Sequence, residues 1–121
     1  MLGKKYNWIK IAGNESEIVL NTESLGIVEA NGEKICVCKF GNQWFGFSLN
    51  CPHAGAMLCE GYVDKDANVV CPVHSYRFSI KNGRNAEGED YRLKTYPVEC
   101  RRDGVFIGIE EKRKWNWLGS K

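Results

Sequence analysis

Two short stretches carry residue types that bind metals, and together they contain both histidines of the chain. Cys51-Pro52-His53 and Cys71-Pro72-Val73-His74 each offer one thiolate and one imidazole, and seventeen residues separate the two stretches. Thiolates and imidazoles are ligands for zinc and for iron. Because each histidine lies within three residues of a cysteine, the sequence predicts that Cys51, His53, Cys71 and His74 form one metal site.

The spacing of these four residues separates two kinds of metal site. A structural zinc ion takes four nitrogen or sulfur ligands, which this set supplies, but zinc sites commonly pair cysteine with cysteine and histidine with histidine. Here each stretch mixes one cysteine with one histidine. A two-iron cluster with two thiolates on one iron and two imidazoles on the other needs such a mixture. The spacing therefore favours an iron–sulfur cluster, and structural zinc is the alternative.

Length and composition limit the other functions that the chain can have. Its 121 residues correspond to one domain, and a chain of this size buries a core without disulfides. A net charge of +2 with 26% charged residues gives no indication of nucleic-acid or membrane binding. No apolar run approaches the ~20 residues of a membrane helix, and the polar start has no signal-peptide core. We therefore expect a cytoplasmic protein.

The four remaining cysteines are expected to be structural. In a reducing cytoplasm, cysteines are metal ligands or buried thiols before they are disulfides. Cys36 and Cys38 lie two positions apart on a predicted strand, so we expect two buried thiols there rather than a second metal site. Cys59 lies close to the first metal-binding stretch and is expected to serve in packing, and Cys100 is expected in the core.

Short apolar stretches alternate with turn residues along the chain. In residues 34–40, Ile35 and Val37 share one face of a predicted strand, and Cys36 and Cys38 share the other. Asn31-Gly32 is the strongest kind of two-residue hairpin signal. Because no helical period or repeat is evident, the pattern predicts an all-β, antiparallel domain. Strands are expected at residues 8–11, 26–30, 34–40, 43–49, 77–80, 93–100 and 105–109, with further turns at 41–42, 64–68, 82–83 and 103–104.

The residues around the two metal-binding stretches resemble the cluster loops of Rieske-type ferredoxins. Residues 51–61 (CPHAGAMLCEG) resemble the first loop, and residues 71–83 (CPVHSYRFSIKNG) resemble the second loop with its following hairpin. With the opening and closing strands, the resemblance covers about residues 6–110. It implies a Rieske-type antiparallel β sandwich or barrel, in which residues 1–121 form a single domain with an inserted cluster-binding subdomain at about 48–80.

The resemblance also implies one [2Fe-2S] cluster per chain. Cys51 and Cys71 would bind the inner iron, and His53 and His74 would bind the outer iron near the surface. Neutral imidazoles put less negative charge on their iron than thiolates do, which raises the reduction potential above that of an all-cysteine ferredoxin.

Departures from one branch of the family predict a low potential within the Rieske range. Respiratory-complex Rieske proteins join their loops by a disulfide, and the matching positions here are Ala56 and Val73. Those proteins also place a serine and a tyrosine two and four residues after the second histidine, and the hydroxyls donate to the cluster sulfurs. Here Tyr76 and Phe78 occupy these positions. Fewer donors stabilise the reduced cluster less, so we expect a midpoint of about −150 mV.

By resemblance, the protein is expected to be a soluble one-electron carrier and not itself an enzyme. It would pass electrons from a reductase to an oxygenase or similar terminal enzyme, without nucleic-acid or membrane partners. One alternative is a small subunit of a larger redox enzyme such as assimilatory nitrite reductase, and a second is a structural zinc module. The chain is too short to hold a flavin domain or a mononuclear iron site beside the cluster.

Two groups of apolar residues have more than one interpretation. Trp115 and Trp117 near the C-terminus are expected to fold back onto the barrel, although they would also suit contact with a partner. Five residues beside the histidines fit either a rim for docking a redox partner or simple stiffening of the loops: Pro52, Ala54, Met57, Pro72 and Val73.

Overall fold

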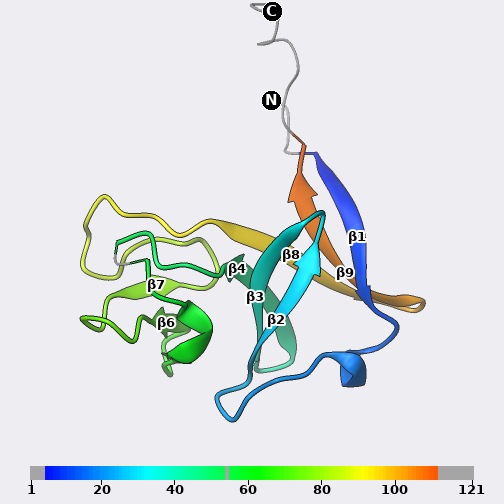
Figure 1. Cartoon of the computed structure of the whole chain (residues 1–121), viewed down its shortest axis with the longest axis horizontal. Helices are drawn as coiled ribbons and strands as arrows, with labels where there is room; N and C mark the ends of the chain where they lie inside the picture. The colour runs from blue at the N-terminus through cyan, green and yellow to red at the C-terminus, as the bar shows by residue number, and fades with distance from the viewer. Residues whose placement is uncertain (1–4, 54, 112–121) are drawn as a thin grey trace, which may run out of the picture.

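Antiparallel strands make up most of the computed structural model, which describes residues 5–53 and 55–111 (Figure 1). A six-stranded sheet has the order β1-β9-β8-β4-β3-β2, and a three-stranded sheet has the order β5-β6-β7. The expected all-β architecture is confirmed, and no helix in the described ranges is long and apolar enough to span a membrane. The strands are β1 Tyr6–Ala12, β2 Leu25–Ala30, β3 Glu33–Phe40, β4 Gln43–Ser48, β5 Tyr62–Val63, β6 Asn68–Val70, β7 Arg77–Ser79, β8 Thr95–Arg101 and β9 Gly104–Glu110, and the short 3-10 helices are η1 Glu15–Glu17 and η2 Leu58–Glu60.

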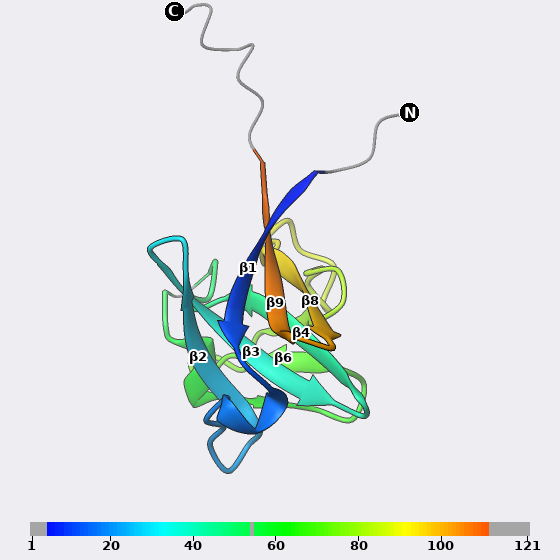
Figure 2. The same cartoon turned by 90° about the vertical axis from the view of Figure 1, so that its right-hand side faces the viewer.

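Local turn chemistry sets the register of the large sheet. Asn31 and Gly32 both have positive φ angles, 54° and 80°, which a two-residue hairpin turn requires. The pair Ala30 and Glu33 closes the β2–β3 hairpin beside them. Strand β1 begins beside the end of β9, with Tyr6 paired to Glu110 (Figure 2). The hairpin predicted at Asn31-Gly32 is therefore confirmed.

Strand β3 is buried on both faces because it separates two hydrophobic cores. Ile35 and Val37 pack in a core formed with β8 and β9. Cys36 and Cys38 face the other way, into a core shared with the segments between β4 and β8. The alternation predicted for this strand is thus confirmed. The second core supports the metal-binding loops.

The chain between β4 and β8 forms a smaller lobe beside the large sheet (Figure 1). The strands β5, β6 and β7 make its small sheet, and Val70 pairs with both Tyr62 and Arg77. Ile80 and Leu93 belong to the same core as Cys51 and Cys71, so the segment after β7 also packs into this lobe. Both metal-binding stretches therefore lie in one inserted unit.

Cys36 and Cys59 form a disulfide, so the expectation that they would be unlinked thiols is wrong. Their Cα atoms are 6.0 Å apart, within the range that a disulfide bridges. The two residues are 23 positions apart in sequence and meet because η2 packs against β2, the strand that pairs with β3. Cys38 is a buried free thiol as expected, and burial raises its pKa to about 12.

Cys100 is exposed, so its predicted place in the core is also wrong. Strand β4 pairs with β8 only at Thr95, Tyr96 and Pro97. Beyond Pro97, β8 pairs with β9 alone and leaves the body of the sheet. The sequence of β8 alone does not show where its neighbour β4 ends, so it does not show which residues of β8 are left uncovered. Trp115 and Trp117 lie outside the described residues.

Candidate metal centre

The two metal-binding stretches share one backbone arrangement. The amide N–H of Cys51 donates to the carbonyl oxygen of Ala56 at 2.8 Å, and that of Cys71 donates to the carbonyl oxygen of Tyr76 at 2.8 Å. In each stretch the bond closes a tight loop whose first residue is the cysteine and whose histidine lies inside. Cys71 directly follows β6, and Cys51 comes three residues after the end of β4. The two strands therefore fix where the loops begin.

The two cysteine side chains are buried next to each other. Cys51 is 2% exposed and Cys71 is 1% exposed, in the same core. Burial raises the pKa of the Cys71 thiol, the N–H of Val73 opposes this by donating to its Sγ at 3.4 Å, and the neighbouring Cys51 adds to the rise. Two adjacent buried thiols resist losing both protons on their own. A cationic metal centre supplies the charge that makes the two thiolates favourable.

The two histidine rings lie close to each other. Their centroids are 6.4 Å apart and the rings are close to perpendicular, at 79°. Nδ1 of His53 is buried and makes no hydrogen bond within the described part of the chain. A buried ring nitrogen without a partner is costly unless it binds a metal. This orphaned nitrogen is the observation that best fits a metal centre at this position.

The backbone at the second loop is held in an uncommon conformation. His74 and Ser75 have φ angles of 63° and 57°, in the left-handed region that non-glycine residues rarely adopt. Such residues cluster at functional sites, where surrounding contacts hold them in place. Both side chains are exposed, so this conformation leaves the His74 imidazole at the surface.

The four candidate ligands lie as two pairs. The cysteines adjoin each other in the core, and the histidines face each other near the surface. Among the described residues, no three Cys, His, Asp or Glu side chains are grouped as ligands of one metal ion. A two-iron cluster takes two thiolates on one iron and two imidazoles on the other. The donor set and its pairing therefore fit this cluster.

Two tyrosines enclose His53. The ring of Tyr76 stacks on the imidazole with centroids 4.0 Å apart and an interplanar angle of 17°. The ring of Tyr91 meets the same imidazole edge-on at 4.8 Å and 80°. Tyr91 was not among the residues singled out from the sequence, and its distance of 38 positions from His53 carries no local signal.

Hydrogen bonds in the segment after β7 hold Tyr91 in this place. The amide of Gly83 donates to the carbonyl of Ser79 at 2.8 Å, and the amide of Leu93 donates to the carbonyl of Gly83 at 2.9 Å. Arg77 and Glu87 form an ion pair of 2.8 Å across the loop. The loop therefore returns to the metal-binding stretches, and Tyr91 contacts His53 while 42% of its surface stays exposed.

Apolar side chains surround the exposed histidine. Pro52, Pro72 and Val73 are exposed, and Val73 keeps 39% of its surface accessible. Met57 is half-buried, and Ala54 lies outside the described residues. Their use in docking a partner stays a prediction.

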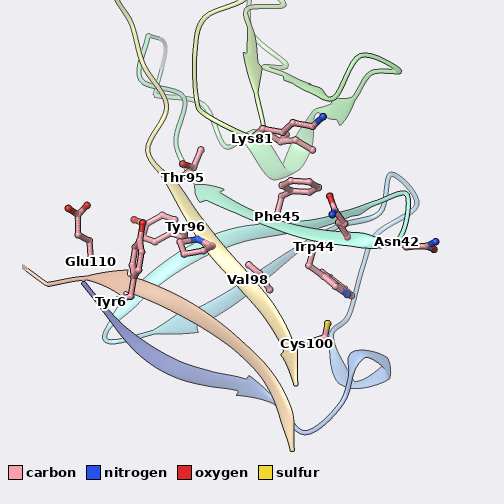
Figure 3. A pocket seen from close by; sticks show the side chains of 13 residues that line it. Tyr6, Asn42, Trp44, Phe45, Lys81, Thr95, Tyr96, Val98, Cys100 and Glu110 are labelled. Atoms are coloured by element: carbon pink, nitrogen blue, oxygen red, sulfur yellow. The ribbon is translucent and has the colours of Figure 1, made fainter. Parts of the chain in front are cut away.

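A separate hollow of about 530 Å³ lies along β8, away from the candidate ligands. Figure 3 shows Tyr6 and Glu110 toward one end of it and Asn42 and Cys100 toward the other. None of the four candidate ligands lines this hollow. The metal-binding loops are therefore distinct from it.

Comparison with known proteins assigns the family. A model of the Rieske [2Fe-2S] domain family matches residues 7–97, which include both metal-binding stretches. The chain belongs to the Rieske [2Fe-2S] domain family. The expected Rieske-type fold and [2Fe-2S] cofactor are thereby confirmed.

Its relatives include ferredoxin subunits of dioxygenases. The 3-phenylpropionate/cinnamic acid dioxygenase ferredoxin subunit of Escherichia coli (strain K12) is 33% identical over 79 residues, which are 64% of this chain and 74% of the relative. The ferredoxin of carbazole 1,9a-dioxygenase from Nocardioides aromaticivorans IC177 has a TM-score of 0.69 at 19% identity, covering 84% of this chain and 96% of that chain. The small subunit of an NADH-dependent nitrite reductase from Mycobacterium tuberculosis, as that structure is described, has a TM-score of 0.72 at 14% identity, covering 91% and 99%. The structural matches establish the fold.

Proposed function

We propose that this protein is the Rieske ferredoxin of an oxygenase system, carrying single electrons from a reductase to a terminal oxygenase. The observation that carries the proposal is the family match across both loops together with the 33% identical dioxygenase ferredoxin subunit. A related ferredoxin has been seen in complex with the oxygenase of carbazole 1,9a-dioxygenase, with a TM-score of 0.70 to this chain. The protein is an electron-transfer component and not the catalyst.

We assign Cys51 and Cys71 as ligands of the inner iron and His53 and His74 as ligands of the outer iron. The cluster supplies a centre that accepts and releases one electron. The chain's own contribution is to bury the thiolates, to enclose His53 and to leave His74 at the surface. The subdomain that performs this is proposed at about residues 48–80. A cytoplasmic location is also part of the proposal, and cell fractionation tests it.

The ligand assignment is tested by replacing His53 with cysteine. A thiolate puts more negative charge on its iron than an imidazole, so His53→Cys is expected to lower the midpoint potential or to cost the protein its cluster. Iron and sulfide analysis, the visible spectrum and a redox titration give the readout. Cys100→Ser, which changes an exposed cysteine outside the loops, is the matched control and keeps an unaltered cluster. An unchanged spectrum and potential in His53→Cys would show that His53 is not a ligand.

The transfer step is tested with the holoprotein reduced under anaerobic conditions. Mixing it with a purified Rieske oxygenase is expected to oxidise the ferredoxin. When O2 and the organic substrate of that oxygenase are then added, product is expected to form once for every two electrons delivered. Stoichiometric zinc in a colourless protein would overturn the proposal in favour of the structural zinc module.

The small subunit of a nitrite reductase is the second candidate, because such a protein has this fold with a TM-score of 0.72. A ferredoxin binds its partners briefly, whereas a subunit stays bound. Size-exclusion chromatography of the native protein from cell extract separates the two. Elution in a stable stoichiometric complex with a larger reductase would favour the subunit.

A further inference from the structure

We propose that the Cys36–Cys59 disulfide is a redox-controlled staple that seats the first cluster loop on the large sheet and slows loss of the cluster. The inference rests on the proposed function only in taking this loop as the holder of cluster ligands. Cys36 lies within β3 of the large sheet, and Cys59 lies in η2 of the inserted lobe. The cross-link therefore joins the two parts of the molecule that meet beneath the cluster loops.

The position of the disulfide gives it control over the first loop. The residues that it encloses, from Cys36 to Cys59, include Cys51 and His53. Cys59 is only eight positions after Cys51, so the link limits how far this ligand can move from the sheet. Cys36, Cys51 and Cys59 all belong to one buried core. A cross-link acts mainly by removing open conformations, and here these are conformations in which the loop leaves the core.

Two hydrogen bonds hold η2 at the place where the staple closes. The amide of Leu58 donates to the carbonyl oxygen of Leu49 at 2.7 Å. The side-chain amide of Asn21 donates to the carbonyl oxygen of Cys59 at 3.0 Å. The first bond is within the lobe and the second ties η2 to the segment before β2. Cys59 is thus presented to β3 by contacts that do not depend on the disulfide.

The reduced state also has a place for the Cys59 sulfur. Its Sγ lies 3.2 Å from the carbonyl oxygen of Gly26, which is an acceptor for the thiol hydrogen once the disulfide is reduced. A buried polar group without a partner would be costly. Because this acceptor is already in position, the core can hold the Cys59 thiol after reduction without leaving it unpaired.

Closure of the staple is a thiol–disulfide exchange with a small-molecule disulfide of the glutathione class. One cysteine thiolate attacks the reagent, which forms a mixed disulfide and releases one small thiol. The second cysteine thiolate then displaces the other small thiol and forms the Cys36–Cys59 bond. Two protein thiols and one disulfide reagent give one protein disulfide and two small thiols, so atoms and electrons balance without the cluster. Cys36 is 0% and Cys59 is 5% exposed, so exchange requires opening of the lobe and is slow in the closed protein.

The oxidation state is measured by counting thiols. The holoprotein is denatured in excess N-ethylmaleimide without reductant, and the mass of the chain is measured by mass spectrometry. Four adducts are expected without reduction, at Cys38, Cys51, Cys71 and Cys100, and six adducts are expected after prior reduction. A non-reducing digest is expected to contain a peptide in which Cys36 is linked to Cys59. Six adducts without reductant, from protein purified in air and treated with glutathione disulfide, would overturn the proposal. This count does not depend on electron transfer, so it stands or fails separately from the proposed function.

The effect on cluster retention is measured with Cys36→Ala, Cys59→Ala and the double variant. The rate of iron release to a chelator is measured from the bleaching of the visible spectrum. It is expected to be about tenfold faster in all three variants, because each variant removes the same disulfide. Cys38→Ala is the matched control: it removes a buried thiol two positions along β3, in the same core, without touching the staple. The rate of iron release from Cys38→Ala is expected to stay within about twofold of the rate from the unmodified protein.

Two results would overturn this role. Additive effects of the two single variants, or an equal effect of Cys38→Ala, would show that packing and not the link retains the cluster. If the variants do not fold, the unmodified holoprotein incubated with a phosphine reductant, which cleaves the disulfide without offering thiolates to the iron, replaces them. Faster iron release with unchanged far-ultraviolet circular dichroism supports the staple, and an unchanged rate after six adducts have been verified contradicts it.

Discussion

The two candidate histidine ligands have the same chemistry but different surroundings. Tyr76 and Tyr91 cover the imidazole of His53, whereas His74 is exposed on a loop held in the left-handed conformation. Electron transfer between proteins needs a short path through the contact surface. Because of this asymmetry, we expect His74 to lie nearer a bound partner than His53, whose ring is covered by the two tyrosines.

The tyrosine that closes over His53 is expected to slow cluster loss. Tyr91→Ala removes the edge-on ring contact, which is worth about 1 kcal/mol, so iron release to a chelator should be about fivefold faster. Solvent deuterium should also come closer to the reduced centre, as measured by pulsed electron paramagnetic resonance. Tyr91→Phe keeps the ring and is expected to behave like the unmodified protein.

Tyr62→Ala provides the surface control for this prediction. Tyr62 is 48% exposed on β5 and has no ring contact with His53. If it accelerated iron release as much as Tyr91→Ala, shielding of His53 would not be the reason.

Two glycines in the segment after β7 have nearly the same backbone conformation and very different surroundings. Gly83 and Gly88 have φ angles of 79° and 82°, but a Cβ atom at Gly83 would lie 1.9 Å from the carbonyl oxygen of Leu93, while nothing lies within 4 Å at Gly88. Gly88→Ala is expected to cost about 1 kcal/mol from its φ angle alone. Gly83→Ala must also displace Leu93 from the core, and with it the neighbouring Tyr91.

The comparison of these two variants isolates the contact from the φ angle. Thermal unfolding followed by circular dichroism should show a clearly lower midpoint for Gly83→Ala than for Gly88→Ala. Iron release should be faster in Gly83→Ala as well. Equal midpoints would mean that the close approach of Gly83 to Leu93 does not support the lobe.

At the level of elements, the sequence predicted what depends on neighbours in the chain. The Asn31-Gly32 turn and the two faces of β3 follow from local φ requirements and from alternation. The short strand β5 and the 3-10 helices carry too few residues to show a period. The exposure of Cys100 depends on where β4 stops pairing, which is a property of another strand.

The candidate ligands were predictable because their types are rare and closely spaced, whereas their environment was not. The contact of Tyr91 with His53 and the bond between Cys36 and Cys59 join residues 38 and 23 positions apart. Such contacts are set by how the inserted lobe packs on the large sheet. The expectation of a reducing compartment also favoured free thiols. A disulfide between Cys36 and Cys59, which only the fold brings together, was therefore not predicted.

In the molecule as a whole, the large sheet supports the fold, and the smaller lobe carries the candidate cluster ligands. Strands β3 and β4 contribute to both cores, so the lobe that carries the loops shares its foundation with the large sheet. Strands β1 and β9 lie at one edge of the sheet, on the side away from the lobe (Figure 1). A carrier built this way keeps its ligands fixed when its charge changes, because both cysteines are anchored in a packed core.

The reduction potential is the whole-molecule property that remains to be measured, and we expect a midpoint of about −150 mV, at the low end of the Rieske range. Phe78 is fully buried in the core with Cys51 and Cys71 and has no hydroxyl to donate to a cluster sulfur. Phe78→Tyr supplies such a donor, which stabilises the reduced form and should make the midpoint less negative.

Phe47→Tyr is the matched control for this potential, because it adds the same hydroxyl to another fully buried phenylalanine of the same core, on β4. Its potential should stay at that of the unmodified protein even if its stability falls, since a general disturbance of packing changes both variants alike. A redox titration that gives a midpoint well above zero for the unmodified protein would contradict the low potential. Equal shifts in Phe78→Tyr and Phe47→Tyr would show that the missing hydroxyl is not its cause.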